Sequence, residues 1–360
     1  VKAIETEAFW CCEYMKHVTI PQSVTKIGER AFCACNWLEN LDIPQGVISI
    51  GNLAFHGCNL LTSIIIPNSV TRIGEGAFGY CRSLEQVSIG SGVMDMGNNP
   101  FSGCDKLVSF RGKYATDDGR ALIKDGILIS YAKGNRMLSY IIPDSVTGIG
   151  DCAFQHCSSL TSINIPENLT SIGNMAFYDC KALNYITIPN TIKKIGYDAF
   201  YGCGALIRVY ITDIASWCGI DFEYNRTRPY SNPLWYCPSL YINDEIVKDL
   251  IIPDTVTSIG NYAFYNCKGL NSVTIPNSIT SIGESAFYNC SNIKSVNITD
   301  LVSWCKIKFS RESNPLYHAK QLYLNGEVIR NLEFPHNIDT IGAYAFAGCN
   351  SLTSISIPDG

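Results

Sequence analysis

Charge is scarce in this sequence: charged residues make up 16% of the 360 residues, against about a quarter in average domains. Lys and Arg (27) fall short of Asp and Glu (32), which gives a net charge of −5. A nucleic-acid partner would require a basic surplus, so that class of function is disfavoured. The sequence contains no run of about eighteen apolar residues, so it predicts no membrane span. Nor does its N-terminus have the basic segment followed by an apolar segment that is typical of a signal peptide. The hydrophobic share of 46% excludes intrinsic disorder.

Patterns of catalytic residues are also missing. The five histidines, His17, His56, His156, His318 and His336, are scattered without metal-ligand spacing. Glycine-rich phosphate loops are absent. His156 stands beside Cys157, but adjacent residues of a helix diverge by about 100°, so we do not expect a nucleophile and its base there. We therefore expect no enzyme, no cofactor and no metal site in this chain, while a catalytic domain elsewhere in a longer parent protein stays open.

A short repeat dominates what the sequence does contain. Its Phe, usually preceded by Ala, recurs at one constant spacing, the one that separates Phe9 from Phe32. This spacing holds from Phe9 to Phe101, from Phe154 to Phe200 and from Phe264 to Phe287, and three longer gaps interrupt it. Repeats of this length are typical of solenoids. The eleven copies are Phe9, Phe32, Phe55, Phe78, Phe101, Phe154, Phe177, Phe200, Phe264, Phe287 and Phe346.

Each apolar position of the unit has a predicted place. Ile64 and Ile66 are two residues apart, the period of a strand, and Pro67 ends that strand because proline donates no amide hydrogen. Ala77, Phe78, Cys81 and Leu84 follow Gly74 at a spacing that predicts one face of a short helix. Since so short a unit cannot bury these faces alone, its copies stack. The fold class is therefore a strand-rich α/β solenoid with a parallel sheet and short helices.

The combined pattern Ile-Pro-x-x-Val-x-x-Ile-Gly-x-x-Ala-Phe-x-x-Cys, as in residues 66–81, resembles the leucine-rich repeats of the BspA-like, or Treponema pallidum, type. The resemblance covers nearly the whole chain. It implies a right-handed coil, exposure on a bacterial cell surface, and attachment to host matrix proteins, glycans or other microbes.

Three insertions interrupt a single solenoid that spans 1–360. Asp125-Gly126 predicts a hairpin turn within the first insertion. The second and third resemble each other: Asp213 and Asp300 are placed to cap a helix that carries a packed Trp, and Asn325-Gly326 predicts a two-residue turn. Whether the insertions bind a partner or only elaborate the coil stays open. Regular repeats occupy 1–112, 141–211, 250–298 and 332–360, and insertions occupy 113–140, 212–249 and 299–331.

Eleven of the seventeen cysteines lie three residues after the repeat Phe. Stacked in register, they would have Cβ atoms about 4.8 Å apart, wider than a disulfide accepts. We expect buried free thiols that act as small apolar fillers. Cys218 and Cys237, which share one insertion, are the pair to test for a bridge.

The outward strand positions are mostly small and polar, with one exception in mid-chain. Tyr and Arg, which dominate binding hot spots, replace small residues there, so the candidate ligand-binding residues are Tyr185, Thr187, Arg208, Tyr210 and Tyr241. Tyrosines on a sheet surface can equally be cross-strand stabilisers, and both interpretations stay open. A second row, Tyr178, Tyr201, Tyr265 and Tyr288, recurs with the period, which favours stacking between coils.

The sequence thus favours a non-enzymatic binding or adhesion module, extracellular or on the cell surface, whose partner is a protein or a glycan. A structural spacer or an accessory region of a larger secreted protein or enzyme is the alternative. The chain opens inside a unit and ends at 358–360 without a polar capping repeat, so we expect a fragment or covered termini.

Overall fold

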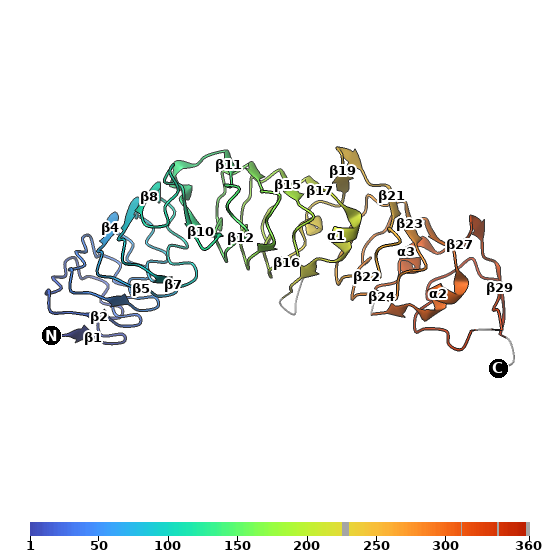
Figure 1. Cartoon of the computed structure of the whole chain (residues 1–360), viewed down its shortest axis with the longest axis horizontal. Helices are drawn as coiled ribbons and strands as arrows, with labels where there is room; N and C mark the ends of the chain where they lie inside the picture. The colour runs from blue at the N-terminus through green and yellow to red at the C-terminus, as the bar shows by residue number, and fades with distance from the viewer. Residues whose placement is uncertain (225–229, 311, 337, 358–360) are drawn as a thin grey trace. The chain divides into compact units, whose positions relative to one another are not determined.

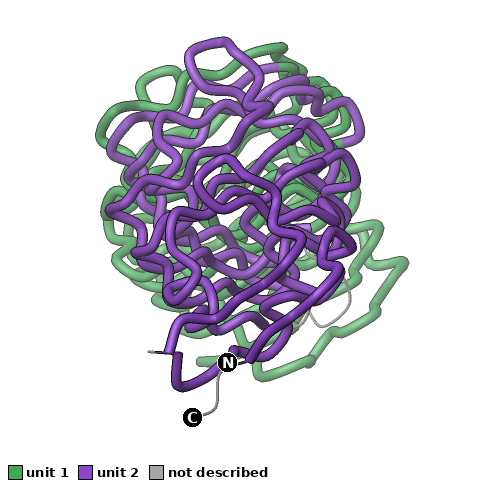
Figure 2. Tube along the Cα trace, turned by 90° about the vertical axis from the view of Figure 1, so that its right-hand side faces the viewer, with its two compact units in different colours: residues 1–161, 172–182, 199–203 green, residues 162–171, 183–198, 204–360 purple. Residues whose placement is uncertain are grey.

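The structure is a computed structural model that describes residues 1–224, 230–310, 312–336 and 338–357; the expected terminus at 358–360 lies outside them. Contacts divide the chain into two compact units, which Figure 2 colours separately. Unit 1 comprises Val1–Thr161, Ile172–Ala182 and Ala199–Cys203, and unit 2 comprises Ser162–Ser171, Leu183–Asp198 and Gly204–Gly360. Each unit is a stack of short parallel strands (Figure 1), so the predicted solenoid is confirmed.

In unit 1 the strands are short and regularly spaced. Their bounds are β1 (Ala3–Ile4), β2 (Lys26–Ile27), β3 (Ser49–Ile50), β4 (Ser63–Ile66), β5 (Arg72–Ile73), β6 (Gln86–Ile89), β7 (Asp95–Met96), β8 (Ser109–Gly112), β9 (Ala121–Lys124), β10 (Ile127–Tyr131), β11 (Ser139–Ile141) and β12 (Gly148–Ile149). Two parallel ladders run in the orders β1-β2-β3-β5-β7 and β4-β6-β8. A 3-10 turn, η1 (Lys133–Asn135), follows β10. Strand β14 (Ser171–Ile172) lies where the two units divide.

Unit 2 continues the same pattern and adds the helices. Its strands are β13 (Ser162–Asn164), β15 (Tyr185–Ile188), β16 (Lys194–Ile195), β17 (Arg208–Ile211), β18 (Asp221–Phe222), β19 (Leu240–Ile242), β20 (Glu245–Ile246), β21 (Asp249–Ile251), β22 (Ser258–Ile259), β23 (Ser272–Ile275), β24 (Ser281–Ile282), β25 (Ser295–Ile298), β26 (Lys308–Phe309), β27 (Leu322–Leu324), β28 (Glu327–Val328), β29 (Asn331–Glu333) and β30 (Ser354–Ser356). Its helical segments are α1 (Ile214–Cys218), η2 (Pro233–Trp235), α2 (Leu301–Lys306) and α3 (Leu316–Ala319). The larger sheets run β15-β17-β19-β20 and β21-β23-β25-β27-β28.

Strand register follows the repeat. Ile64 lies opposite Val87 and Ile66 opposite Ile89, so equivalent residues of neighbouring coils stack directly. Both isoleucines are buried, whereas Ile65 between them is 71% exposed, which is the alternation expected of a strand with one buried face. The inward positions therefore form continuous apolar rows through each unit.

The segment around the repeat Phe is not the short helix that the spacing predicts. It is a run of hydrogen-bonded turns. Every second amide donates to the next coil instead of to its own segment: the N–H of Phe32 donates to the Ala54 carbonyl at 2.7 Å, and that of Ala34 to the His56 carbonyl at 2.7 Å. The coil-to-coil ladder takes the amides that a helix would have used internally, so the chain does not form α-helix there.

This ladder imposes an unusual backbone. The residues two before and two after each of the eleven repeat phenylalanines all have positive φ, including bulky ones such as Leu53, Met175 and Tyr262. A left-handed conformation costs a residue other than glycine roughly 1–2 kcal/mol. The hydrogen bonds between coils offset this cost, because alternate amides can point to the neighbouring coil only if left-handed residues recur along the segment.

Inside the coils the phenylalanines form stacked columns. Seven successive pairs, from Phe9–Phe32 to Phe264–Phe287, have ring centroids 5.1–5.6 Å apart and planes within 12° of parallel. Beside them, thiols donate to the Phe carbonyl of the preceding coil, as Cys81 does to Phe55 at 3.2 Å. All seventeen cysteines are unpaired, Cys218 and Cys237 included. Seven of the eleven ladder cysteines donate to a Phe carbonyl in this way. Nine of the eleven are buried as predicted, whereas Cys12 is exposed and Cys349 is half-buried.

The first insertion forms a hairpin. Strands β9 and β10 pair antiparallel, and Asp125 and Gly126 at the turn between them have φ of 51° and 77°, as the Asp-Gly signal predicts. Tyr131 at the end of β10 takes the place of a repeat Phe: its N–H donates to the Ala153 carbonyl at 3.0 Å and its ring lies 5.0 Å from that of Phe154 at a 34° tilt. The hairpin therefore keeps the ladder, and Tyr131 lies one repeat length before Phe154, so the extra residues of the insertion fall between Phe101 and Tyr131.

The second and third insertions are built alike, as predicted. Asp213 accepts from the Ser216 N–H and caps α1, and Asp300 accepts from the Ser303 N–H and caps α2. Trp217 and Trp304, each 1% exposed, donate their indole N–H to the carbonyls of the next repeat's alanine, Ala263 at 2.8 Å and Ala345 at 3.1 Å. The Trp side chain thus replaces the backbone amide that a repeat Phe would supply.

A buried asparagine completes each of these insertions. Nδ2 of Asn232 donates to the Tyr262 and Ala263 carbonyls, and Nδ2 of Asn314 donates to those of Tyr344 and Ala345. Further along, Asn325 and Gly326 join β27 to β28 with φ of 51° and 87°, so the predicted two-residue turn is confirmed. Residues 225–229 of the second insertion lie outside the described residues.

Candidate functional site

The five candidate ligand-binding residues lie on three neighbouring strands of one sheet in unit 2. Strand β15 pairs in parallel with β17, which places Tyr185 opposite Arg208 and Thr187 opposite Tyr210. Strand β17 pairs with β19, which places Tyr210 opposite Tyr241. These five residues, here called the tyrosine strip, therefore form one continuous surface.

Exposure differs along the tyrosine strip. Tyr185 is 41% exposed and Arg208 is exposed, whereas Thr187, Tyr210 and Tyr241 are half-buried. Tyr210 is less exposed than its outward position predicts, because its ring packs between those of Tyr185 and Tyr241, with centroids 6.2 and 5.4 Å away. The three rings brace one another across the strands, and their outer edges remain at the surface.

Arg208 is the charged member of the strip. Its guanidinium forms no ion pair or hydrogen bond with the residues that the structure describes. A planar, permanently charged group beside aromatic rings offers bidentate hydrogen bonds to a carboxylate and stacking to an aromatic partner. The strip can therefore recognise a surface that carries acidic or aromatic side chains.

A cleft borders the strip. The sheet ends at β20, where Ile246 lies opposite Tyr241, and Ile246 also lines a cavity of about 700 Å³. Four isoleucines and three charged residues contribute to its wall: Ile214, Ile242, Ile246, Ile251, Glu245, Lys248 and Asp249. Apolar and charged groups lie side by side there, which suits an amphipathic partner segment.

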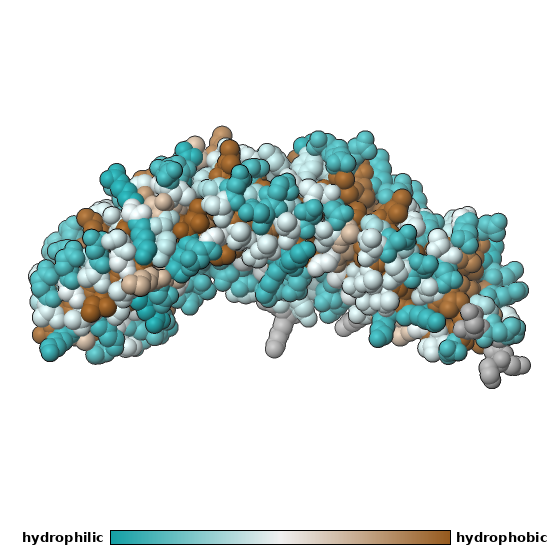
Figure 3. Space-filling model, in the orientation of Figure 1, coloured by the Kyte–Doolittle hydropathy of each residue, from teal (hydrophilic) through white to brown (hydrophobic). Residues whose placement is uncertain are grey.

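The second tyrosine row has the stacking role predicted for it. Rings of Tyr178 and Tyr201 stack at 4.8 Å and those of Tyr265 and Tyr288 at 5.2 Å. Trp235 extends the latter pair, stacking on Tyr265 at 5.3 Å. Figure 3 shows hydrophobic residues scattered between hydrophilic ones on the visible face.

Titratable groups inside the coils are held neutral. Burial raises the pKa of Cys104, Cys203 and Cys267 to about 12 in each case, so these thiols stay protonated at pH 7 and are poor nucleophiles. His156 faces Asp179, with Nδ1 3.4 Å from Oδ2. Among the described residues, no group of three His, Cys, Asp or Glu side chains is arranged to hold a metal ion.

One site escaped the sequence analysis. A cavity of about 600 Å³ in unit 1 is lined by residues from the repeats around Phe78, Phe101, Phe154 and Phe177 and by the first insertion. One available signal was the long gap between Phe101 and Phe154, which the first insertion fills. Another was the repeat itself, because eight lining residues stand two or four positions after a repeat Phe: Tyr80, Arg82, Gly103, Asp105, His156, Ser158, Asp179 and Lys181.

The comparisons place the chain in a family. The model of the BspA type leucine rich repeat region matches residues 2–116, 130–219, 239–316 and 319–360 in 6 copies. The chain therefore belongs to the BspA-type leucine-rich-repeat family. No helix among the described residues is long and apolar enough to cross a bilayer. A search of curated proteins found no match.

Two solved structures share the fold. A leucine-rich repeat protein from Eubacterium ventriosum is 21% identical over 94% of this chain and 82% of its own, with a TM-score of 0.59. One from Bacteroides ovatus is 23% identical over 99% of this chain and 88% of its own, with a TM-score of 0.56. Both are leucine-rich repeat proteins, and the likeness concerns the fold alone.

Proposed function

We propose that this protein is a non-enzymatic binding module that docks a partner protein on the tyrosine strip, at the surface of a bacterial cell or outside it. The observation that carries the proposal is Arg208, which has no ion pair or hydrogen bond among the described residues, within a row of tyrosines across β15, β17 and β19. Tyr and Arg are enriched among the few residues that supply most of the binding energy at protein interfaces. Family membership supports the surface location, because that is what the resemblance implies.

The surroundings of the strip support a protein partner. Tyr185 and Arg208 are exposed at one end, and the cleft beyond Ile246 lies at the other. A partner segment that covers the strip and enters the cleft would meet a hydrophobic centre with a charged rim, which is the usual anatomy of a specific interface.

The test is a binding array of purified host matrix proteins, secreted bacterial proteins and glycans, probed with the full chain. We expect at least one protein hit that Arg208→Ala and Tyr185→Ala each weaken about tenfold or more. Arg330→Ala removes another exposed arginine of unit 2, outside the strip, and is the matched control that should bind as the wild type does. Hits that the strip variants leave unchanged, or no hits at all, would overturn the proposal and favour the structural spacer.

Location is tested separately. Intact cells of the source organism should expose the chain to added protease or to an antibody against it. Labelling that requires lysis would contradict a surface position while leaving the binding assay unaffected.

A further inference from the structure

The cavity of unit 1 lies where the first insertion replaces a coil. Its wall combines Tyr80 and Arg82, Gly103 and Asp105, segment 131–137, segment 156–160, and Asp179 with Lys181. The insertion is tied to the repeat before it, since Gly134 N–H donates to the Leu107 carbonyl at 2.7 Å, and to the repeat after it through Tyr131 and Ala153. The cavity is therefore a built part of unit 1, and its wall comes from several coils.

Positive charge exceeds negative charge in this wall. Four cations, Arg82, Lys133, Arg136 and Lys181, face two carboxylates, Asp105 and Asp179. With His156 neutral, the cations outnumber the carboxylates two to one, in a chain whose net charge is −5. The local charge is opposite to that of the whole molecule.

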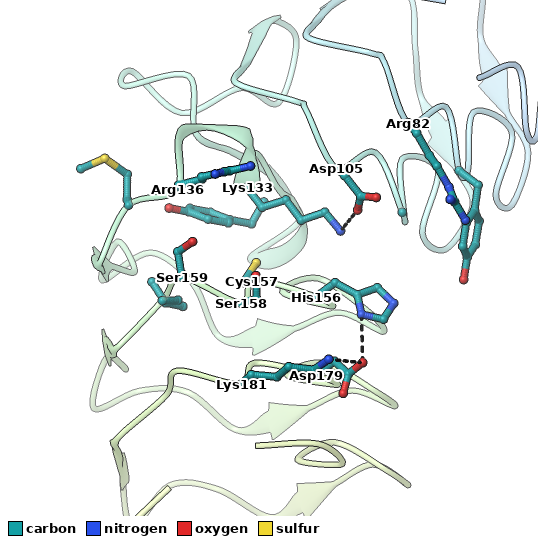
Figure 4. A pocket seen from close by; sticks show the side chains of 15 residues that line it. Arg82, Asp105, Lys133, Arg136, His156, Cys157, Ser158, Ser159, Asp179 and Lys181 are labelled. Carbon is teal, nitrogen blue, oxygen red and sulfur yellow. Dashed lines mark ion pairs between the residues drawn. The ribbon is translucent and has the colours of Figure 1, made fainter. Parts of the chain in front are cut away.

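Both carboxylates are already engaged. Asp105 pairs with Nζ of Lys133 at 2.9 Å, and the Lys133 side chain is only 9% exposed. Asp179 pairs with His156 at 3.4 Å and with Lys181 at 3.8 Å. Figure 4 shows these two clusters across the cavity. The acidic groups are thus occupied by partners within the protein.

Arg82 and Arg136 are the cations left over. Neither guanidinium forms an ion pair or a hydrogen bond with a described residue, and the two lie on opposite sides of the cavity in Figure 4. Both are exposed, so each is free to bind an oxyanion in bidentate fashion. Their separation suits a ligand with negative charge at both ends.

A buried hydroxyl supplies independent evidence for a ligand. Tyr131 lines the cavity and is 6% exposed, and its hydroxyl oxygen has no hydrogen-bond partner within the part of the chain that the structure describes. Buried polar groups without partners are rare because each retains its desolvation cost. Burial raises the pKa of Tyr131, so this hydroxyl keeps its proton and can donate it.

Neutral donors complete the wall. Ser158 and Ser159 line it beside Arg136 (Figure 4), and Tyr80 adds an aromatic ring. The free side chains of the wall are thus hydrogen-bond donors, and the ring of Tyr80 lies among them. This combination suits a ligand that is itself a hydroxylated ring with acidic groups.

We propose that this cavity binds an acidic saccharide, a short sugar whose carboxylate or sulfate groups pair with Arg82 and Arg136 while its hydroxyls bond to Tyr131, Ser158 and Ser159. The site is separate from the tyrosine strip and does not depend on the function proposed for it. An acidic peptide is the rival ligand, because its carboxylates and carbonyls could meet the same donors, and the experiment below compares the two directly.

The test is calorimetric titration of the full chain with a sulfated uronate disaccharide at low ionic strength. A neutral disaccharide of similar size, inorganic sulfate and a glutamate-rich hexapeptide are titrated in parallel. We expect the acidic disaccharide to bind, to weaken as salt is added, and to exceed inorganic sulfate and the neutral sugar at least tenfold in affinity. Equal binding of the neutral sugar, tighter binding of the hexapeptide, or no binding of the disaccharide would overturn the proposal.

Variants locate the site. Arg82→Gln and Arg136→Gln should each lose about tenfold in affinity. Arg111→Gln is the matched control, because Arg111 is another exposed arginine of unit 1 without an ion pair among the described residues. Tyr131→Phe should weaken binding severalfold without lowering thermal stability, since it removes a hydroxyl that no protein group satisfies. If Tyr131→Phe binds as the wild type does, or if Arg111→Gln is as impaired as the cavity variants, the assignment fails.

Discussion

The regular coils and the three insertions differ in how they satisfy their polar groups. In the coils, backbone amides and Cys thiols bond to the neighbouring coil, and stacked phenylalanines fill the centre. In the second and third insertions side chains take over: the indoles of Trp217 and Trp304 donate in place of a backbone amide, and Asn232 and Asn314 cap open carbonyls. In the first insertion Tyr131 keeps the backbone hydrogen bond, and only its ring replaces a phenylalanine.

This difference between coils and insertions indicates where binding sites can form. A coil with an identical neighbour has its carbonyls, amides and inward apolar face covered, so it offers a partner only separate outward side chains, such as Ile65 and Met94. Where an insertion interrupts the coils, other side chains replace the repeat residues. Their irregular packing leaves the cavity of unit 1 and the cleft beside β20. Both proposed sites lie at or next to such interruptions.

The largest expected effect separates the core column from the tyrosine strip. Phe177 is fully buried between two stacked rings, so Phe177→Ala should lower the free energy of unfolding by about 3–5 kcal/mol. Tyr210→Ala removes half-buried cross-strand contacts and should cost about 0.5–1 kcal/mol. Urea unfolding followed by circular dichroism measures both. An equal decrease in the free energy of unfolding for both variants would mean that the tyrosine strip is part of the core.

The next effect tests the capping role of the insertions. Asn232 is fully buried and its amide makes three hydrogen bonds, to Tyr262, Ala263 and Leu234. Asn232→Ala should cost about 1–3 kcal/mol, because buried groups lose their partners. The control is Asn292→Ala, which removes one exposed hydrogen bond and should cost much less. A similar small loss for both would contradict the cap.

A smaller effect concerns the helix caps. Asp300→Ala should cost about 1 kcal/mol at pH 7, while Asp300→Asn keeps an acceptor for the Ser303 amide and should cost less. The hydrogen bonds from the Ser303 side chain and backbone lower the pKa of Asp300. Its charge-dependent stabilisation is therefore complete above its unfolded pKa of about 3.9 and is lost as the pH falls through the lower folded pKa. Thermal melts of wild type and Asp300→Asn between pH 2 and 7 should converge in acid; parallel curves would contradict this account.

The smallest effect is a pH dependence of the proposed saccharide site. Burial lowers the pKa of His156, and the nearby Lys133 lowers it further, so the imidazole is neutral at pH 7 and gains its proton only in mild acid. The charged groups facing it are Lys133, Lys181, Asp105 and Asp179. One added positive charge should tighten binding of the sulfated disaccharide about two- to fivefold once the pH is low enough, below the usual histidine value of 6.5, for His156 to take up its proton. His156→Gln should abolish this gain, and weaker binding in acid would contradict it.

Much of the fold could be predicted from the sequence because the repeat fixes local geometry. Ile64 and Ile66 alternate as a strand requires, Asp213 and Asp300 precede helices that they cap, and Asn325-Gly326 makes its turn. The segment after Gly74 was predicted as a helix and is a run of turns. The reason is tertiary: left-handed residues as different as Leu53 and Met175 share no local signal, and only the neighbouring coil gives them their conformation.

The candidate sites were predictable to different degrees. The tyrosine strip followed from period and alternation, since residues one repeat apart lie on adjacent strands, as Thr187 and Tyr210 do. The cavity of unit 1 followed only in part. Most of its lining residues from the repeats stand two or four positions after a repeat Phe, as Asp179 and Arg82 do, but Lys133 and Arg136 come from the first insertion, whose path the period does not give.

By itself, the sequence determined the coil: a short, constant period, with apolar rows that no single unit can bury, leaves stacking as the solution. The tertiary structure alone decided which polar groups find partners. Hydrogen bonds between coils and the path of the first insertion satisfy Asp105 and Asp179 and leave Arg136 and the Tyr131 hydroxyl without partners among the described residues. That outcome depends on distances between segments far apart in the chain, which a one-dimensional pattern does not contain.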